Sequence, residues 1–159
     1  VVYGIHGVCS IVAIEQQMID RKKTDFFVLQ PLEQPDSRYY VPVHNQIAVS
    51  KLRPLLSAEE LEDLLQSPCD GIVTWIEDEN QRKNKYREMI NSGDRGALLC
   101  MIRLLHDHKQ TQLAAGRKFH LCDENFLKDA KKVLSAEFAL VLGIPKQDVG
   151  AYIEEKLFK

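Results

Sequence analysis

The side chains best suited to chemistry are one tryptophan and the cations that follow it. Trp75 is the only tryptophan and lies in the apolar run Gly71–Ile76. Residues 57–80 hold eight acidic and no basic side chains, whereas residues 81–118 hold nine basic and three acidic ones. Cations neutralise DNA phosphates, and an apolar side chain can wedge between base steps. The candidate DNA-contacting residues are Trp75, Arg82, Lys83, Lys85, Arg87, Arg95, Arg117 and Lys118.

The same features also have a simpler interpretation. A single tryptophan often packs in a core or between domains, and runs of charge commonly form solvated helix faces. The alternative hypothesis is therefore a protein-interaction module that binds another protein without contacting DNA. In that case Trp75 belongs to the core, and a blue-shifted, quencher-resistant fluorescence would favour it.

Signals for catalysis and for metal binding are weak. None of the motifs GxGxxG, GxxxxGK[ST], HExxH or GxSxG occurs. His106 and His108 point to different faces of a helix, and neighbours such as His120 and Cys122 rarely have the geometry of a nucleophile and its base. We expect no enzyme, catalytic residue, metal or cofactor. A third hypothesis, an enzyme that uses Cys122 or the histidines, requires a base within hydrogen-bond reach of Cys122.

Length and composition restrict the class of protein. The 159 residues are 45% hydrophobic and 28% charged, which is typical of one globular domain or two small ones. A net charge of −2 excludes a globally basic protein, and no apolar run approaches the roughly 20 residues of a membrane span. The spacings of Cys9, Cys69, Cys100 and Cys122 fit neither a CxxC site nor a dense disulfide framework. They favour four reduced thiols in a cytoplasmic protein.

The hydrophobic period changes from 2 to 3.6 near Leu56. Short β-rich runs separated by turns within residues 1–53 predict a small barrel. Pro42 cannot donate to a ladder, so its strand is expected at an edge or a bulge. The pattern after Ser57 is helical. We therefore expect an α+β protein, with a small β-barrel in residues 1–56 and an all-α helical bundle in residues 57–159.

Capping signals place the predicted helices. Ser57 begins a capping box, and Gly93 suits the left-handed C-cap of a helix over about 77–91. A long helix begins near Asp123 and ends at Gly143. Pro145 suits the first position of a short last helix.

Ordered short motifs resemble those of the CarD/CdnL transcription regulators, whose polymerase-interacting domain also occurs in the transcription-repair coupling factor. The likeness covers nearly the whole chain and looks most like the branch found in clostridia and related Firmicutes. The opening VVYGIHGV resembles "VVYPxHGVG", and the segments FFVL, VPV and LRPL resemble the family's "YYVL" and "VPVENA…GLRPL". In the helical half, the matching segments are Ser92–Asp94, like the "SGD" joint, and Leu134–Ala139, like "ILxxELA".

The resemblance implies a Tudor-like barrel that docks on the β subunit of bacterial RNA polymerase by pairing at a sheet edge. Gln17 and Tyr40 occupy positions where the family often carries polymerase-contacting arginines, and Pro42 follows in the same strand as Tyr40. These three are the predicted polymerase-binding residues.

The resemblance also implies a helical domain on promoter DNA at the upstream edge of the transcription bubble. A family tryptophan wedges there and prolongs the open complex. In the family, the tryptophan lies at a set distance before the serine of the "SGD" joint, and the same distance before Ser92 falls on Glu79. Trp75 therefore lies on the helix face of the family tryptophan only if the helix begins about one turn earlier. The expected partners are the RNA polymerase β subunit and promoter DNA, bound sequence-independently, with no membrane and no small-molecule substrate. The expected location is cytoplasmic and nucleoid-associated.

Overall fold

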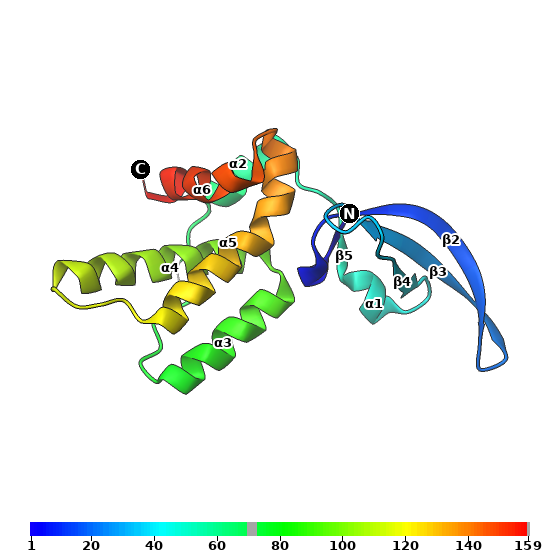
Figure 1. The fold of residues 1–159 in the computed structure, drawn as a ribbon, viewed down its shortest axis with the longest axis horizontal. Coiled ribbons are helices and arrows are strands. Elements are labelled where there is room, and N and C mark those ends of the chain that lie inside the picture. The colour runs from blue at the N-terminus through cyan, green and yellow to red at the C-terminus, as the bar shows by residue number, and fades with distance from the viewer. Residues whose placement is uncertain (70–72, 159) are drawn as a thin grey trace. The chain divides into compact units, whose positions relative to one another are not determined.

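A computed structural model describes residues 1–69 and 73–158, which divide into two compact units. Unit 1 is Val1–Leu55 and unit 2 is Leu56–Lys159. Unit 1 is formed mainly of antiparallel strands and unit 2 of helices, so the α+β class is confirmed (Figure 1). Gly71 and Ile72, from the apolar run before Trp75, lie outside the described residues.

Unit 1 has two small antiparallel sheets among the residues described. The first pairs β1 with β5, and the second has the order β2–β3–β4. A single bridge between Val2 and Val8 links the start of the chain to the segment before β2. The strands are β1 (Val2–Tyr3), β2 (Cys9–Ile19), β3 (Lys22–Pro31), β4 (Tyr39–Pro42) and β5 (Leu52–Arg53).

The strands of the predicted small barrel do not close into one continuous sheet. β1 and β5 contain only two residues each, too few to connect the edges of a three-stranded sheet. The chain leaves β1 through the 3-10 turn η1 (Gly4–His6), where Gly4 and Gly7 have φ values of 48° and 82°. These left-handed conformations bend the backbone away from an extended course.

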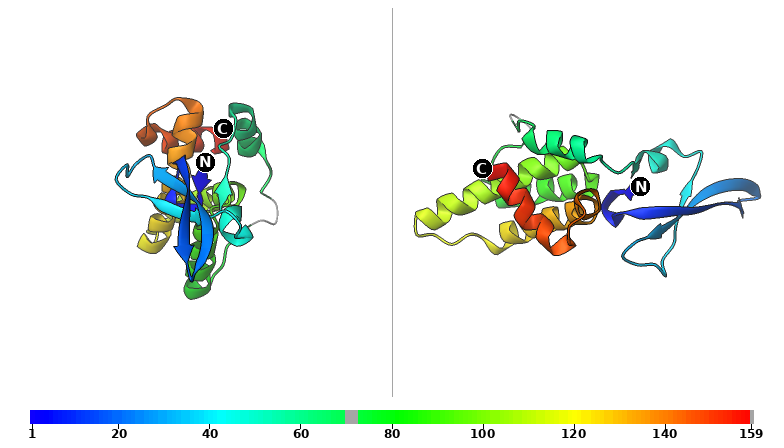
Figure 2. Two further views of the ribbon diagram at one scale, coloured as in Figure 1. Left: turned by 90° about the vertical axis from the view of Figure 1, so that its right-hand side faces the viewer. Right: turned by 90° about the horizontal axis from the view of Figure 1, so that it is seen from above.

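A long hairpin of β2 and β3 dominates unit 1 (Figure 2). At the tip of this hairpin, Asp20 and Arg21 turn the chain with φ values of 48° and 65°. Two successive positive φ values match the right-handed twist of hairpin strands. The register shifts at a bulge between Ile11 and Ala13. Pro42 lies on β4, an edge strand as expected.

The core of unit 1 is small. Its buried centre is Cys9, Leu29 and Val41, and partly buried aromatic and aliphatic side chains surround it. A short helix, α1 (Gln46–Ser50), was not predicted from the sequence. The Asn45 side chain caps its start by accepting hydrogen bonds from the backbone N–H groups of Ile47 and Ala48.

Unit 2 contains five α-helices within its described residues, and α4 and α5 run side by side as a helical hairpin (Figure 1). The capping box at Ser57 and the left-handed C-cap at Gly93 (φ 65°) are confirmed. Helix α5 ends before Gly143 as predicted, and this glycine is also left-handed (φ 67°). Pro145 precedes a 3-10 turn, η2 (Lys146–Asp148), rather than opening the last helix. The helices are α2 (Ala58–Gln66), α3 (Glu79–Ser92), α4 (Arg95–Ala114), α5 (Leu121–Leu142) and α6 (Val149–Phe158).

One apolar cluster joins all five helices of unit 2. Leu61, Tyr86, Leu98, Phe138 and Ile153 are among its fully buried members. The Tyr86 hydroxyl is buried without a hydrogen-bond partner among the described residues, and burial raises the pKa of this phenol to about 12. The predicted helical core is thus confirmed, with one polar atom left unsatisfied.

The prediction that all four cysteines are reduced thiols is wrong. Cys69, after α2, forms a disulfide with Cys100 of α4, and their Cα atoms lie 5.5 Å apart. Cys9 and Cys122 are free. The 31-residue separation in sequence gave no sign of the pairing, because only the tertiary structure brings Cys69 next to α4.

Within the described part of the chain, no helix has the length and apolarity needed to cross a lipid bilayer.

Candidate functional site

The three predicted polymerase-binding residues share one face of the β2–β3–β4 sheet. Gln17, Pro42 and Tyr40 lie opposite positions 24, 26 and 28 of β3, respectively. These positions alternate along the strand, and directly paired residues point to the same side of a sheet. Tyr40 is exposed, and its ring meets Phe26 edge-on at 6.4 Å. The structure therefore brings the three residues into one surface.

Strand β2 is an edge of this sheet and carries an unusual amount of exposed apolar surface. Its exposed side chains lie on both faces of the strand. A long edge strand with an exposed apolar surface is a template for pairing with another chain. The side chains concerned are 45–65% exposed: Ile11, Val12, Ile14, Met18 and Ile19.

Trp75 lies in the segment before α3 and is partly buried. Helix α3 begins at Glu79, so the earlier start that would place Trp75 on the same face of this helix does not occur. The indole stacks on His108 of α4, with ring centroids 3.5 Å apart and planes 15° apart. The guanidinium carbon of Arg82 lies 4.5 Å from the indole centroid. Burial lowers the pKa of His108, which favours a neutral imidazole against the indole at pH 7.

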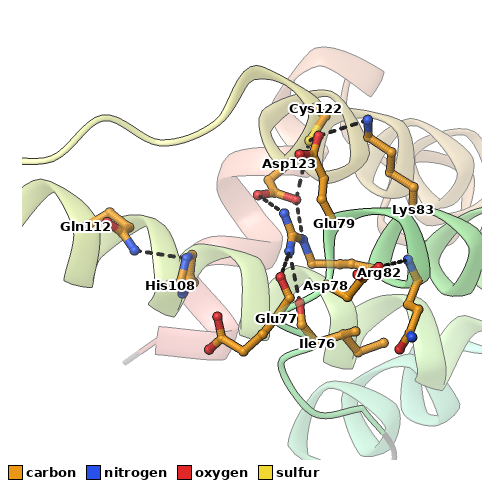
Figure 3. Close-up of polar contacts among 11 residues, drawn as sticks. Ile76, Glu77, Asp78, Glu79, Arg82, Lys83, His108, Gln112, Cys122 and Asp123 are labelled. Carbon is orange, nitrogen blue, oxygen red and sulfur yellow. Dashed lines mark hydrogen bonds and ion pairs between the residues drawn. The ribbon is translucent and has the colours of Figure 1, made fainter.

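The Arg82 guanidinium is buried in unit 2 and forms hydrogen bonds with other residues of that unit (Figure 3). Its Nε donates to Asp123 Oδ1 at 2.9 Å and its Nη2 to Oδ2 at 3.2 Å. Its Nη1 donates to the carbonyl oxygens of Ile76 and Glu77, at 2.9 and 3.3 Å. The two charged side chains are only 5% and 1% exposed. Arg82 therefore joins the Trp75 segment to α5, and we remove it from the set of residues available to phosphates.

Arg95 has a similar structural role. Its Nε donates to Glu137 Oε1 of α5 at 2.6 Å, and its guanidinium also reaches the second carboxylate oxygen. Glu137 is buried, and it also accepts from the backbone N–H of Leu56 at 3.1 Å. We therefore remove Arg95 from the DNA-facing set as well, because its charge is already balanced at the start of α4.

The other cations of α3 lie on its two flanks. Lys83 pairs with Glu79 at 2.9 Å, one turn earlier, and Arg87 follows one turn later on the same flank. Glu79 accepts from Cys122 in the first turn of α5, so this flank lies on the side of α3 that meets the start of α5. Lys85 lies about 160° from Lys83 around the helix axis and projects from the opposite flank. Lys85 and Arg87 are exposed.

Arg117 and Lys118 are exposed in the connection between α4 and α5. Phe119 follows them, and its ring lies 6.3 Å from His108, which stacks on Trp75. The connection thus shares an aromatic cluster with the predicted wedge. Together with the Lys83–Arg87 flank, it gathers cations around the start of α5.

Cys122 lacks the environment of a nucleophile. Its thiol donates to Glu79 at 3.6 Å and to Asp123 at 3.8 Å, both through carboxylate oxygens. Burial and these negative charges raise the pKa of Cys122, whereas a reactive cysteine needs a lowered pKa. The contacts that the structure describes for this thiol therefore disfavour catalysis.

The sequence interpretation missed the two buried carboxylates, Asp123 and Glu137. A signal was present: Asp123 precedes Leu127 by four residues, and Glu137 lies three residues after Leu134 and beside Phe138. Both therefore fall on the apolar face of α5, where an acidic residue requires a partner.

The comparisons with known proteins concern mainly unit 1. Residues 1–54 match the family model described as "CarD-like/TRCF RID domain". No curated protein matches the chain. The match supports the resemblance to a CarD-like/TRCF RID domain for the strand-rich part. The clostridial branch and the resemblance of the helical half stay predictions.

Proposed function

We propose that this protein is a bacterial transcription regulator that docks on the β subunit of RNA polymerase through unit 1 and contacts promoter DNA through unit 2. The observation that carries the proposal is the family match over residues 1–54, which supports an RNA-polymerase-interacting module. The protein acts by binding rather than by catalysis, in the cytoplasm and near the nucleoid. It needs no cofactor.

The edge strand β2 suits docking by strand addition. In this mode main-chain hydrogen bonds supply affinity and alternate side chains supply specificity. Ile14 and Met18 are more than 60% exposed and offer apolar surface to the added strand. Gln17, Tyr40 and Pro42 lie on the other face of the sheet and would contact polymerase from that side.

DNA contact rests on the cations that remain exposed after Arg82 and Arg95 are removed. They project from α3 and from the α4–α5 connection, so they would meet phosphates without reading the sequence. Lys83 shares the flank of Arg87, and its partly exposed pair with Glu79 is weak enough to exchange for a phosphate. The DNA-facing set is Lys83, Lys85, Arg87, Arg117 and Lys118.

Trp75 acts as the wedge in this proposal. To enter a minor groove, the indole would have to leave its stack on His108 and expose its ring to a base step. The protein holds the melted promoter more tightly than the closed one, and the equilibrium shifts by the difference between these affinities. The open complex would then live longer.

Lys118→Glu is expected to shorten the lifetime of the promoter open complex by roughly tenfold, because it loses one phosphate contact and adds repulsion. The matched control is Lys156→Glu on α6, which carries the same charge change and interacts with Glu62 and Tyr152. Heparin-challenge decay with purified polymerase measures the lifetime. Equal lifetimes for Lys118→Glu and Lys156→Glu would argue against DNA contact at this connection.

A protein-interaction module without a DNA role is the second candidate function. The observation that favours it is the partial burial of Trp75 between His108 and Arg82. A Trp75→Ala variant that binds polymerase and leaves the open-complex lifetime unchanged, combined with an unchanged lifetime for Lys118→Glu, would favour this candidate.

A further inference from the structure

Unit 2 has a second basic surface that the DNA-facing set does not include. An open groove of about 490 Å³ lies on the side of α5 that meets η2 and the start of α6. Lys128, Lys131 and Lys132 reach it from α5, where their i, i+3, i+4 spacing places them on one face. We call this surface the lysine groove; its lining is Lys128, Lys131, Lys132, Ser135, Lys146, Gln147 and Gly150.

The lysine groove has an excess of positive charge. Four of its seven described lining residues are lysines and none is acidic. Lys131 forms an ion pair with Glu154 of α6, which offsets one of these charges. Lys128 and Lys132 are exposed and lie one helical turn apart, so they repel each other. A bound anion would relieve this repulsion.

Other features of the lining also suit an anion. The Ser135 hydroxyl donates to the Lys131 carbonyl within α5. The exposed donors of the lining that an anion would meet are Lys128, Lys132 and the side-chain amide of Gln147. Gly150 contributes no side chain, and a Cβ there would lie 3.8 Å from the Lys131 Cδ atom. The volume is within the range of small-ligand sites. The lysine side chains form this lining through their aliphatic stems, and a lysine ammonium binds phosphate as a point charge.

We propose that the lysine groove is a phosphate-binding site. It is separate from the proposed DNA-facing set, because α3 is held to α5 through Asp123, whereas the groove lies toward η2 and α6. The phosphate would come either from a free polyphosphate or from a nucleic-acid backbone. The same ammonium groups serve both sources.

The test uses the full chain with two probes, inorganic tripolyphosphate and a 20-base-pair DNA duplex. The charge-reversed variant is Lys128→Glu/Lys132→Glu, and the matched control is Lys22→Glu/Lys23→Glu on the β2–β3 hairpin, where both lysines are also exposed. Calorimetry with tripolyphosphate should show affinity at least about tenfold weaker for the groove variant than for the control. If the source is a nucleic-acid backbone, the salt slope of duplex binding should fall by about 2.

Glu154→Gln tests the proposal in the opposite direction. It removes the carboxylate that pairs with Lys131 and leaves every lysine in place, so phosphate binding should become several-fold tighter.

The two probes distinguish the sources of phosphate. If the groove variant binds only tripolyphosphate more weakly, the source is a free polyphosphate, and if it binds only the duplex more weakly, the source is a nucleic-acid backbone. The proposal is overturned if the parent protein binds neither probe, or if the groove variant and Glu154→Gln bind both as the control does. The groove variant should still bind polymerase. Loss of phosphate binding with polymerase binding retained would show that the two activities are independent, so this test does not depend on the proposed function.

Discussion

Asp123→Ala is expected to lower the free energy of unfolding of unit 2 by about 3–5 kcal/mol. The substitution leaves the Arg82 guanidinium buried without its counter-charge, since the two side chains are 5% and 1% exposed. Arg82 also binds two backbone carbonyls that precede α3, so losing its position would loosen the segment that carries Trp75. Urea denaturation followed by far-UV circular dichroism measures the loss, and the emission of Trp75 should shift to the red.

The control for this prediction is Glu124→Ala, one residue along α5. Glu124 pairs with Lys109 at 2.9 Å, but both side chains are about a quarter to a third exposed. Pairs of this kind contribute about 1 kcal/mol or less. A second variant, Arg82→Met/Asp123→Leu, should recover part of the stability because neither charge is left buried alone. A cost for Asp123→Ala no larger than that of Glu124→Ala would contradict the structural role of the pair.

Breaking the Cys69–Cys100 disulfide is expected to lower the free energy of unfolding of unit 2 by about 2–4 kcal/mol. The bond closes a loop of 31 residues that contains the Trp75 segment and α3, so it restricts the unfolded chain. Cys100 is buried in α4, which holds the bonded partner against the core. Urea denaturation of the oxidised parent with and without a dithiol reductant measures the difference.

The free cysteines provide the control for the disulfide. Cys9→Ser/Cys122→Ser should retain the full effect of the reductant, whereas Cys69→Ser/Cys100→Ser should be insensitive to it. The oxidised parent should titrate two thiols after denaturation. Four thiols in that sample would show that the bond does not form in solution and would support the prediction of four reduced cysteines.

Local chemistry made most of the helical unit predictable. Ser57, Gly93 and Gly143 mark helix ends through hydrogen bonds and backbone conformations that depend only on nearby residues. The β unit was less predictable, because closing a barrel depends on pairing between strands that are distant in sequence. The short lengths of β1 and β5 decide that outcome here.

The site was predictable in part. The exposure of Lys85, Arg87, Arg117 and Lys118 agrees with a solvent-facing role, which their charge alone suggested. Arg82 was misplaced although it shares the spacing of Tyr86 and Met89, at i, i+4 and i+7, on the buried face of α3. Its partner lies 41 residues away in sequence, and that kind of pairing follows only from the packing of helices.

Equilibrium binding of the full chain to immobilised bacterial RNA polymerase holoenzyme tests the central claim most directly. Ile14→Glu on the β2 edge should weaken binding by about tenfold or more, because it places a charge where an added strand would pack. Ile47→Glu on α1 is the matched control, since Ile14 and Ile47 are 65% and 77% exposed and both belong to unit 1. The account predicts saturable binding of the parent and of Ile47→Glu and a clear loss for Ile14→Glu. Absence of any binding by the parent would contradict the account.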